Sequence, residues 1–177
     1  MERVLITGIS GSGKTTLAKA VEARSGLPRH ELDALHHGPG WVKRPEFEAD
    51  VEAFAAESRW VTEEQYHALL GDLLWSRADT LVWLDLPRSA VMRQVIRRSF
   101  GRAITGRELW NGNREYFRHW LDPEHPIRWA WTHHARDRSV TAERIAAHPH
   151  LTVVRLTSSR AARRWPASLP RTGSAAA

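Results

Sequence analysis

Apolar residues occur along the chain in short continuous runs that alternate with longer amphipathic stretches. The first run, residues 4–7, predicts a short buried parallel strand. Residues 16–25 follow with apolar side chains at helical spacing, and Gly26 stands where a glycine commonly ends a helix. A buried strand followed directly by an amphipathic helix is typical of a parallel α/β sheet.

The same alternation continues to the end of the chain. Further strands are predicted at residues 27–33, 59–66, 80–87 and 151–156. Helices are predicted at residues 45–58, 69–74, 89–100 and 127–147, and Ser158 or Ser159 can cap a last helix. Residues 101–113 contain three glycines and are predicted to be irregular. We therefore expect an α/β fold.

Residues 8–16, Gly-Ile-Ser-Gly-Ser-Gly-Lys-Thr-Thr, fit the phosphate-loop pattern GxxxxGK[ST] between the first strand and the first helix. Glycine permits positive φ angles and close backbone approach, so successive N–H groups can point at phosphate oxygens beside a helix N-terminus. Lys14 adds a full charge for the β- and γ-phosphates, and the Thr15 hydroxyl can bind Mg²⁺. The predicted ATP-binding residues are Gly8, Ser10, Gly11, Ser12, Gly13, Lys14, Thr15 and Thr16.

Carboxylates follow three of the predicted strands, where ligands bind in open α/β sheets. Asp33 is placed to meet a substrate, with an Asx turn or a helix cap as the alternative. Glu63, next to Glu64, ends the third strand. Asp85 ends the apolar fourth strand and resembles a Walker B carboxylate, which holds Mg²⁺ directly or through water. We predict Mg²⁺ bound by Thr15 with support from Asp85 or Glu63.

Histidine and tryptophan side chains are further candidates for the site or the core. His36 and His37 precede a glycine- and proline-containing loop that ends at Trp41, and we expect the two histidines to be loop residues rather than metal ligands. Of the nine tryptophans, Trp60, Trp75 and Trp83 are expected in the core.

Composition limits the class of protein. The chain has 177 residues, no cysteine and no apolar run of the roughly 20 residues that a membrane-spanning helix needs. We expect one domain over residues 1–168, a disordered tail over residues 169–177 and a soluble, cytoplasmic protein without a membrane partner. No feature of the pattern indicates an oligomeric state.

The formal charge is +6, and arginine accounts for it. Eight arginines lie between residues 88 and 119, a segment with two glutamates. A mobile arginine-bearing loop can close over transferred phosphate, whereas a solvated basic surface or an ordinary surface loop is the alternative. The arginines predicted to neutralise the transferred phosphoryl group are Arg93, Arg97, Arg102, Arg107 and Arg114.

Several sequence segments together resemble the small P-loop kinases, which include adenylate kinase and shikimate kinase. More closely, they resemble the adenylate-kinase-like ATPases or DNA topology modulation proteins. The resemblance covers roughly residues 1–165, and it is carried by residues 8–16, 31–35 (Glu-Leu-Asp-Ala-Leu), 39–41 (Pro-Gly-Trp), 77–80 (Arg-Ala-Asp-Thr), 83–88 (Trp-Leu-Asp-Leu-Pro-Arg) and 109–115 (Leu-Trp-Asn-Gly-Asn-Arg-Glu).

The resemblance implies a three-layer fold with five parallel strands and helices on both faces. It also implies a substrate-covering region near residues 34–60, a lid near residues 100–126, and an adenine site bordered by residues 157–160, including Arg160. One segment departs from the family, because Glu63-Glu64-Gln65-Tyr66 stands where many relatives carry Asp-Gly-Asn-Tyr.

These features predict an ATP-dependent phosphotransferase that uses Mg²⁺ and acts on a small hydroxyl- or phosphate-bearing acceptor, with a nucleoside or nucleotide favoured. Lys14, Asp33 and Glu63 are the candidate catalytic residues besides the arginines. Asp33 orients the acceptor and takes its proton. The alternative is a nucleotide-controlled regulatory or nucleic-acid-binding ATPase, but the sequence contains no nucleic-acid-binding signature, so nucleic acid is the less favoured partner.

Overall fold

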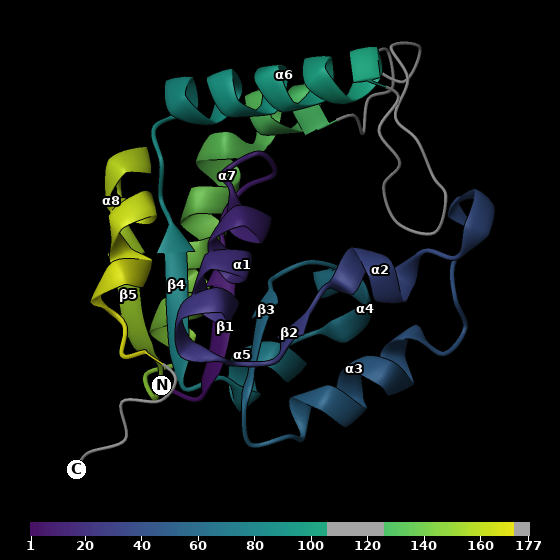
Figure 1. Ribbon diagram of the computed structural model, residues 1–177, viewed down its shortest axis with the longest axis vertical. Helices are drawn as coiled ribbons and strands as arrows, with labels where there is room; N and C mark the ends of the chain where they lie inside the picture. The colour runs from purple at the N-terminus through teal and green to yellow at the C-terminus, as the bar shows by residue number, and fades with distance from the viewer. Residues whose placement is uncertain (106–125, 172–177) are drawn as a thin grey trace.

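The computed structural model describes residues 1–105 and 126–171 (Figure 1). The predicted lid is therefore described only at its two ends. Arg107 and Arg114 lie outside the described residues, as does most of the predicted disordered tail. Within the described ranges, no helix is both long enough and apolar enough to cross a membrane.

Five parallel strands form one sheet in the order β2-β3-β1-β4-β5. The strands are β1 (Arg3–Thr7), β2 (Arg29–His30), β3 (Trp60–Glu63), β4 (Thr80–Leu84) and β5 (Thr152–Leu156). The central strand β1 pairs with β3 on one side and with β4 on the other. Because all strands run in one direction, the segments that leave their carboxyl ends meet along one edge of the sheet.

Helices cover both faces of this sheet (Figure 1). They are α1 (Lys14–Ser25), α2 (Leu32–His36), α3 (Phe47–Ala55), α4 (His67–Leu70), α5 (Leu73–Arg77), α6 (Arg88–Thr105), α7 (Pro126–Ala147) and α8 (Ser159–Arg164), with short 3₁₀ turns η1 (Pro39–Trp41) and η4 (Trp165–Ser168). The predicted α/β class with a five-stranded parallel sheet is confirmed.

Alternating residues of β1 divide the core in two. Val4 and Ile6 pack with α1, α6 and the first part of α7, whereas Leu5 packs with α3 and α5 on the opposite face. This alternation follows from the two-residue period of a strand, and it explains why the buried β1 has apolar side chains at successive positions. The three tryptophans predicted to lie in the core are buried, with exposed fractions of 0%, 1% and 7% for Trp60, Trp75 and Trp83.

Two predicted elements were wrong in extent. The strand expected over residues 27–33 has only two residues, because Leu32 turns into the core and begins α2. Asp33 therefore lies in the first turn of a helix, and His36 is a buried helical residue rather than a loop residue. The helix expected over residues 69–74 is interrupted at Gly71, whose φ of 52° and ψ of −130° are not helical.

The irregular segment predicted from residue 101 starts later than expected. Helix α6 continues through Gly101 to Thr105, so the prediction was wrong for these five residues. Gly101 is exposed, and a Cβ added to it would have no described atom within 4 Å. A helix tolerates such a glycine at a cost of about 1 kcal/mol relative to alanine. The predicted capping of the last helix is confirmed, because the Ser158 hydroxyl accepts a hydrogen bond from the Ala161 backbone N–H.

Candidate active site

The phosphate loop leaves the central strand and turns directly into α1. Three of its glycines have positive φ angles: 145° at Gly8, 83° at Gly11 and 101° at Gly13. A Cβ on Gly11 would lie 2.6 Å from Cβ of Val95 in α6, and one on Gly8 would lie 3.0 Å from the Leu84 carbonyl oxygen. The loop therefore needs glycine both for its backbone conformation and for its close packing against neighbouring elements.

Lys14 and Thr15 begin α1 and face the carboxyl end of β3. The Lys14 ammonium donates a hydrogen bond to the Gly8 carbonyl oxygen at 2.6 Å. Burial lowers the pKa of Lys14, and the nearby charges of Glu63 and Glu64 oppose that shift. The Thr15 hydroxyl donates to Oε2 of Glu63 at 2.7 Å. Thr15 and Glu63, two of the three residues predicted to hold Mg²⁺, are thus in direct contact.

Glu63 is almost fully buried, with 3% of the residue exposed. Burial raises the pKa of its carboxyl group, while the Thr15 hydrogen bond and the Lys14 charge oppose the increase. Its second oxygen, Oε1, accepts no hydrogen bond from any described residue, and the nearest cationic nitrogen is Nη1 of Arg29 at 4.0 Å. A buried carboxylate oxygen without a donor, next to a hydroxyl, is an oxygen set that suits Mg²⁺.

Asp85 has different partners. One of its oxygens accepts from Nε of Arg155 at 2.8 Å, and the other lies 2.9 Å from Nε of Arg138. Both carboxylate oxygens thus already face guanidinium groups, and the carboxylate side chain is only 5% exposed. The arrangement favours Glu63 over Asp85 as the carboxylate for Mg²⁺.

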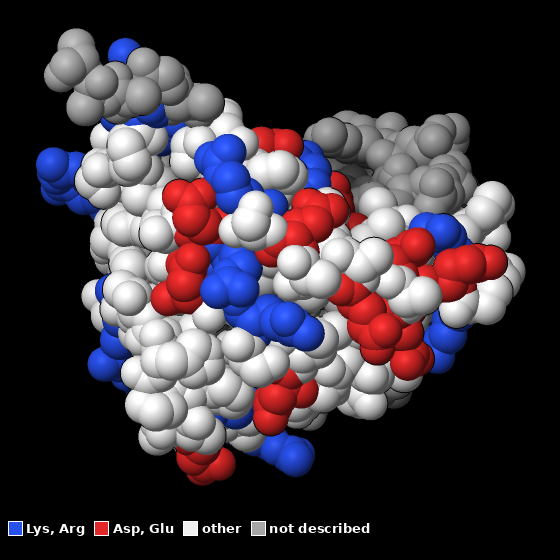
Figure 2. Space-filling view, turned by 90° about the horizontal axis from the view of Figure 1, so that it is seen from below, with Lys and Arg blue, Asp and Glu red and all other residues white. Residues whose placement is uncertain are grey.

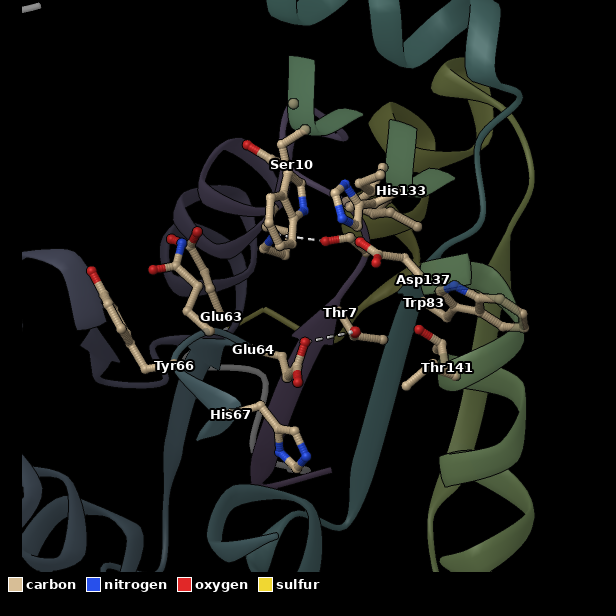
Figure 3. A pocket seen from close by; sticks show the side chains of 18 of the residues that line it. Thr7, Ser10, Glu63, Glu64, Tyr66, His67, Trp83, His133, Asp137 and Thr141 are labelled. Carbon is tan, nitrogen blue, oxygen red and sulfur yellow. Dashed lines mark hydrogen bonds between the residues drawn. The ribbon is translucent and has the colours of Figure 1, made fainter. Parts of the chain in front are cut away.

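Glu64 joins three elements. It accepts a hydrogen bond from the Thr7 hydroxyl at 3.3 Å, drawn as a dashed line in Figure 3, and its other oxygen lies 2.7 Å from Nη1 of Arg144 in α7. Arg144 also reaches Asp72 at 2.8 Å. The Glu64 carboxylate therefore connects the ends of β1 and β3 to α7.

Asp33 is held by an aromatic hydroxyl. Tyr66 donates to Oδ1 of Asp33 at 2.6 Å, and its hydroxyl also lies 3.1 Å from Nε2 of His37. Burial and the Asp33 charge raise the pKa of Tyr66, so its phenol remains protonated and keeps donating. The N-cap position of α2 belongs to Glu31, so Asp33 is not the helix cap that the sequence left as an alternative.

One cavity of about 1300 Å³ brings these groups together. Its walls come from the phosphate loop, α2, residues 63–68, the end of β4, α6 and α7. In Figure 3, Glu63 and Tyr66 lie on one side of this pocket, and His133 and Asp137 of α7 lie across from them. The phosphate-loop lysine and the predicted acceptor residue Asp33 thus face one shared space.

Two of the five predicted arginines lie away from the cavity. Arg93 and Arg97 are exposed on α6 and do not line the cavity, and the side chain of Arg102 lies outside the described residues. Arg98 of the same helix does line it. Arg160 is exposed on α8 and is not part of the cavity wall.

Sequence reasoning also missed the face of α7 that closes the pocket. Trp129, His133, Asp137 and Thr141 recur every fourth residue and line the cavity. Burial raises the pKa of Asp137, and the charges of His133 and Lys14 oppose the shift. The four-residue spacing of polar and aromatic side chains was visible in the sequence and is the signal that could have identified this face.

Comparisons with known proteins support the fold. No protein-family model matches the chain, and no curated protein matches it. The chain is similar to the structure of a shikimate kinase from Acinetobacter baumannii in complex with shikimate, with a TM-score of 0.56, 13% identity, and 94% of this chain and 89% of that chain covered. This likeness shows that the two chains share a fold.

Two further solved structures align over similar lengths. A sugar kinase from Janibacter aligns with a TM-score of 0.40 and 20% identity, covering 94% of this chain and 88% of that one. A gluconokinase from Sinorhizobium meliloti aligns with a TM-score of 0.46 and 16% identity, covering 94% and 91% of the two chains.

Proposed function

We propose that the protein is an ATP-dependent phosphotransferase that moves the γ-phosphoryl group to a hydroxyl group of a small acceptor. The observation that carries the proposal is the shared cavity, in which Lys14 of the phosphate loop and the Asp33–Tyr66 pair face the same space. A nucleotide-binding module without transfer chemistry has no need for a carboxylate positioned there.

The phosphate end of the site uses backbone and side-chain donors. The loop N–H groups and the α1 N-terminus bind phosphate oxygens, and Lys14 exchanges its contact with Gly8 for the β- and γ-phosphates. Thr15 and Glu63 would hold Mg²⁺, which would neutralise part of the phosphate charge. Arg98 adds positive charge from α6.

Asp33 acts as the base at the acceptor end. The acceptor oxygen forms a bond to the γ-phosphorus, the bond from that phosphorus to the ADP oxygen breaks, and the acceptor proton passes to the Asp33 carboxylate. Tyr66 is a positioning residue, because its hydroxyl holds Oδ1 of Asp33 and cannot itself take the proton. A nucleoside or nucleotide is a candidate acceptor, and the loop after β5, near Arg160, is the proposed border of the adenine.

The test is ADP release by purified protein with Mg-ATP, alone and with a panel of nucleosides, nucleotides and hydroxylated metabolites. We expect one acceptor class to raise turnover and Lys14→Ala or Asp33→Asn to lower it by about 10² or more. Lys19→Ala is the matched control for the lysine, because Lys19 is exposed on α1 away from the cavity. ATP binding with no transfer to any acceptor would refute the proposal.

The alternative of a nucleic-acid-driven ATPase has its own outcome in this experiment, namely turnover that rises only with DNA or RNA and falls steeply with salt. The surface at the amino-terminal ends of the strands does not favour nucleic-acid binding. There, basic and acidic side chains are interspersed (Figure 2), and Arg59 pairs with Glu2 at 2.7 Å.

A further inference from the structure

The Tyr66 hydroxyl has two polar neighbours but only one hydrogen to donate. Oδ1 of Asp33 lies 2.6 Å from the hydroxyl oxygen, and Nε2 of His37 lies 3.1 Å from it. All three side chains line the cavity. An ionised carboxylate carries no hydrogen, so the short contact with Asp33 uses the hydrogen of the hydroxyl. The hydroxyl oxygen is then left to accept a hydrogen bond from His37.

Asp33 and His37 lie on the same side of α2. His37 is the residue that ends this helix, and its backbone N–H donates to the Asp33 carbonyl oxygen at 3.1 Å. Side chains four residues apart share one face of a helix. Tyr66 comes from the segment that follows β3 and lies at one side of the pocket (Figure 3). Its hydroxyl therefore contacts two side chains that the local chain already places together.

His37 can donate in this contact only when its Nε2 carries a hydrogen. Nε2 carries one in the charged ring and in one of the two neutral tautomers. In the other tautomer, Nε2 would face the hydroxyl oxygen with a lone pair, unless Tyr66 turned its hydrogen away from Asp33. Hydrogen bonds to ionised acceptors are the stronger ones, so the hydrogen stays with Asp33. The contact therefore selects a His37 ring with a hydrogen on Nε2.

The neighbouring imidazole is compatible with this hydrogen. Nδ1 of His36 lies 3.4 Å from Nε2 of His37. Burial lowers the pKa of His36 most, and the charge of His37 lowers it further. The His36 ring is therefore neutral near about pH 7, and one of its nitrogens can accept. A hydrogen on Nε2 of His37 thus has acceptors on both neighbours, Tyr66 and His36.

Packing fixes the ring of Tyr66 but not the direction of its hydroxyl hydrogen. The ring stacks on that of His36 with centroids 4.1 Å apart, and it meets the Phe47 ring at 5.2 Å. Rotation about the bond between the ring and the hydroxyl oxygen moves only the hydrogen. The ring contacts therefore cannot choose between Asp33 and His37. That choice depends on which neighbour supplies a donor.

We propose that His37 is a positioning residue for the acceptor end of the cavity. Its Nε2–H donates to the Tyr66 oxygen, and the Tyr66 hydroxyl donates to Oδ1 of Asp33, which leaves the second carboxylate oxygen for the acceptor hydroxyl. Each hydrogen bond in such a chain polarises the next. The inference rests on the proposed phosphotransferase function and deepens it, because it adds a residue that acts on the base through Tyr66.

The first test compares two substitutions of His37. His37→Leu removes the donor, whereas His37→Gln places an N–H group near the position of Nε2. We expect His37→Leu to lower kcat about tenfold and to change KM for the acceptor by less than about threefold, and His37→Gln to keep kcat within about threefold of the wild type. His150→Leu is the matched control, because His150 is exposed and does not line the cavity. An unchanged kcat in His37→Leu, or an equal loss in His37→Gln, would overturn the inference.

A double-mutant cycle tests whether His37 acts through Tyr66. Tyr66→Phe keeps the ring and removes the hydroxyl, so the addition of His37→Leu should lower kcat by less than about twofold more. A full further loss of about tenfold would mean that His37 acts without Tyr66, against the proposed role. Calorimetry should give ADP affinities within about twofold of the wild type. A loss of ADP affinity as large as the loss in kcat would assign His37 a structural role instead.

The hydrogen on Nε2 can be tested without any acceptor. NMR spectra that correlate ring protons with ring nitrogens distinguish a nitrogen that carries a hydrogen from one that does not, and His37→Gln identifies the His37 signals. We expect a hydrogen on Nε2 in the nucleotide-free protein, and a bare Nε2 would overturn the inference. Transfer to no acceptor by the wild type would refute the proposed function instead, while the NMR result would still decide the direction of the hydrogen bond.

Discussion

Among single residues, Glu63 is proposed to bind Mg²⁺ although its burial lowers the stability of the folded protein. Its carboxyl is buried, and its folded-state pKa is raised above 4.5, the ordinary value of a glutamate side chain. The unfolded chain therefore ionises first as the pH rises through about 4.5, and folding becomes progressively less favourable until the folded-state pKa is passed. Below that range both states are protonated, and the penalty is absent.

Glu63→Gln should therefore stabilise the nucleotide-free protein near pH 8 and have little effect near about pH 4. The glutamine can still accept the Thr15 hydrogen bond that Glu63 accepts at 2.7 Å. The same substitution should weaken Mg²⁺-dependent ADP binding by about tenfold or more. Urea unfolding at the two pH values and calorimetry with and without Mg²⁺ provide the measurements, and an equal stability change at both pH values would contradict the burial argument.

Asp85→Asn tests whether Asp85, rather than Glu63, binds Mg²⁺. It leaves the guanidinium groups of Arg138 and Arg155 without a charged partner, and we expect a loss of about 1–2 kcal/mol of stability because both arginines are half exposed. Its Mg²⁺-dependent ADP binding should stay near that of the wild type. A loss of Mg²⁺ dependence in Asp85→Asn but not in Glu63→Gln would assign the metal to Asp85.

Between elements, the packing of α6 against the phosphate loop should control nucleotide binding. Gly11→Ala would place a Cβ 2.6 Å from Cβ of Val95 at a φ of 83°, so strain and a clash act together. Gly71→Ala introduces the same kind of backbone strain, at a φ of 52°, but no clash, because no described atom lies within 4 Å of the added Cβ. We expect Gly11→Ala to cost about 2–3 kcal/mol and most ADP affinity, and Gly71→Ala to cost about 1 kcal/mol with affinity retained.

Thermal unfolding and ADP calorimetry on the two glycine variants separate these effects. Equal losses in both would mean that backbone strain alone, and not contact with α6, makes Gly11 necessary.

At the scale of the whole molecule, Arg144 connects α7 to the opposite half of the sheet. Its guanidinium contacts Glu64 at 2.7 Å and Asp72 at 2.8 Å and lies 4.2 Å from the centre of the Trp75 ring. The arginine side chain is 13% exposed, so these contacts are partly shielded from water. It thus holds the cavity-lining helix against the elements that follow β3.

Arg144→Ala should lower the free energy of unfolding by about 2–3 kcal/mol, since it leaves the largely buried Glu64 carboxylate unpaired and removes the contact with Trp75. Arg93→Ala, at an exposed position of α6, should change it by less than about 0.5 kcal/mol. Urea denaturation of both variants tests this, and similar stabilities would show that α7 is held by apolar packing alone.

Local patterns located most of the elements and the candidate phosphate site. The strands, the long helices and the loop at residues 8–16 depend on spacings within a few residues, so the order of amino acids is enough to locate them. Packing overrode local preference at Leu32, whose burial ended the predicted second strand. At the exposed Gly101 the error has another cause, because a helix tolerates a single glycine and α6 continues through it.

Contacts between distant residues were decided only by the tertiary structure. The sequence identified Asp33, Glu63 and Asp85 as strand-associated carboxylates but could not distinguish their partners, which come from residues at least 33 positions away: Tyr66, Thr15 and Arg155. Likewise it indicated an arginine cluster, and only the orientation of α6 placed Arg98 in the cavity and Arg93 outside it. The sequence by itself located the candidate phosphate site because a short loop forms it, whereas the proposed acceptor end depends on how α2, β3 and α7 meet.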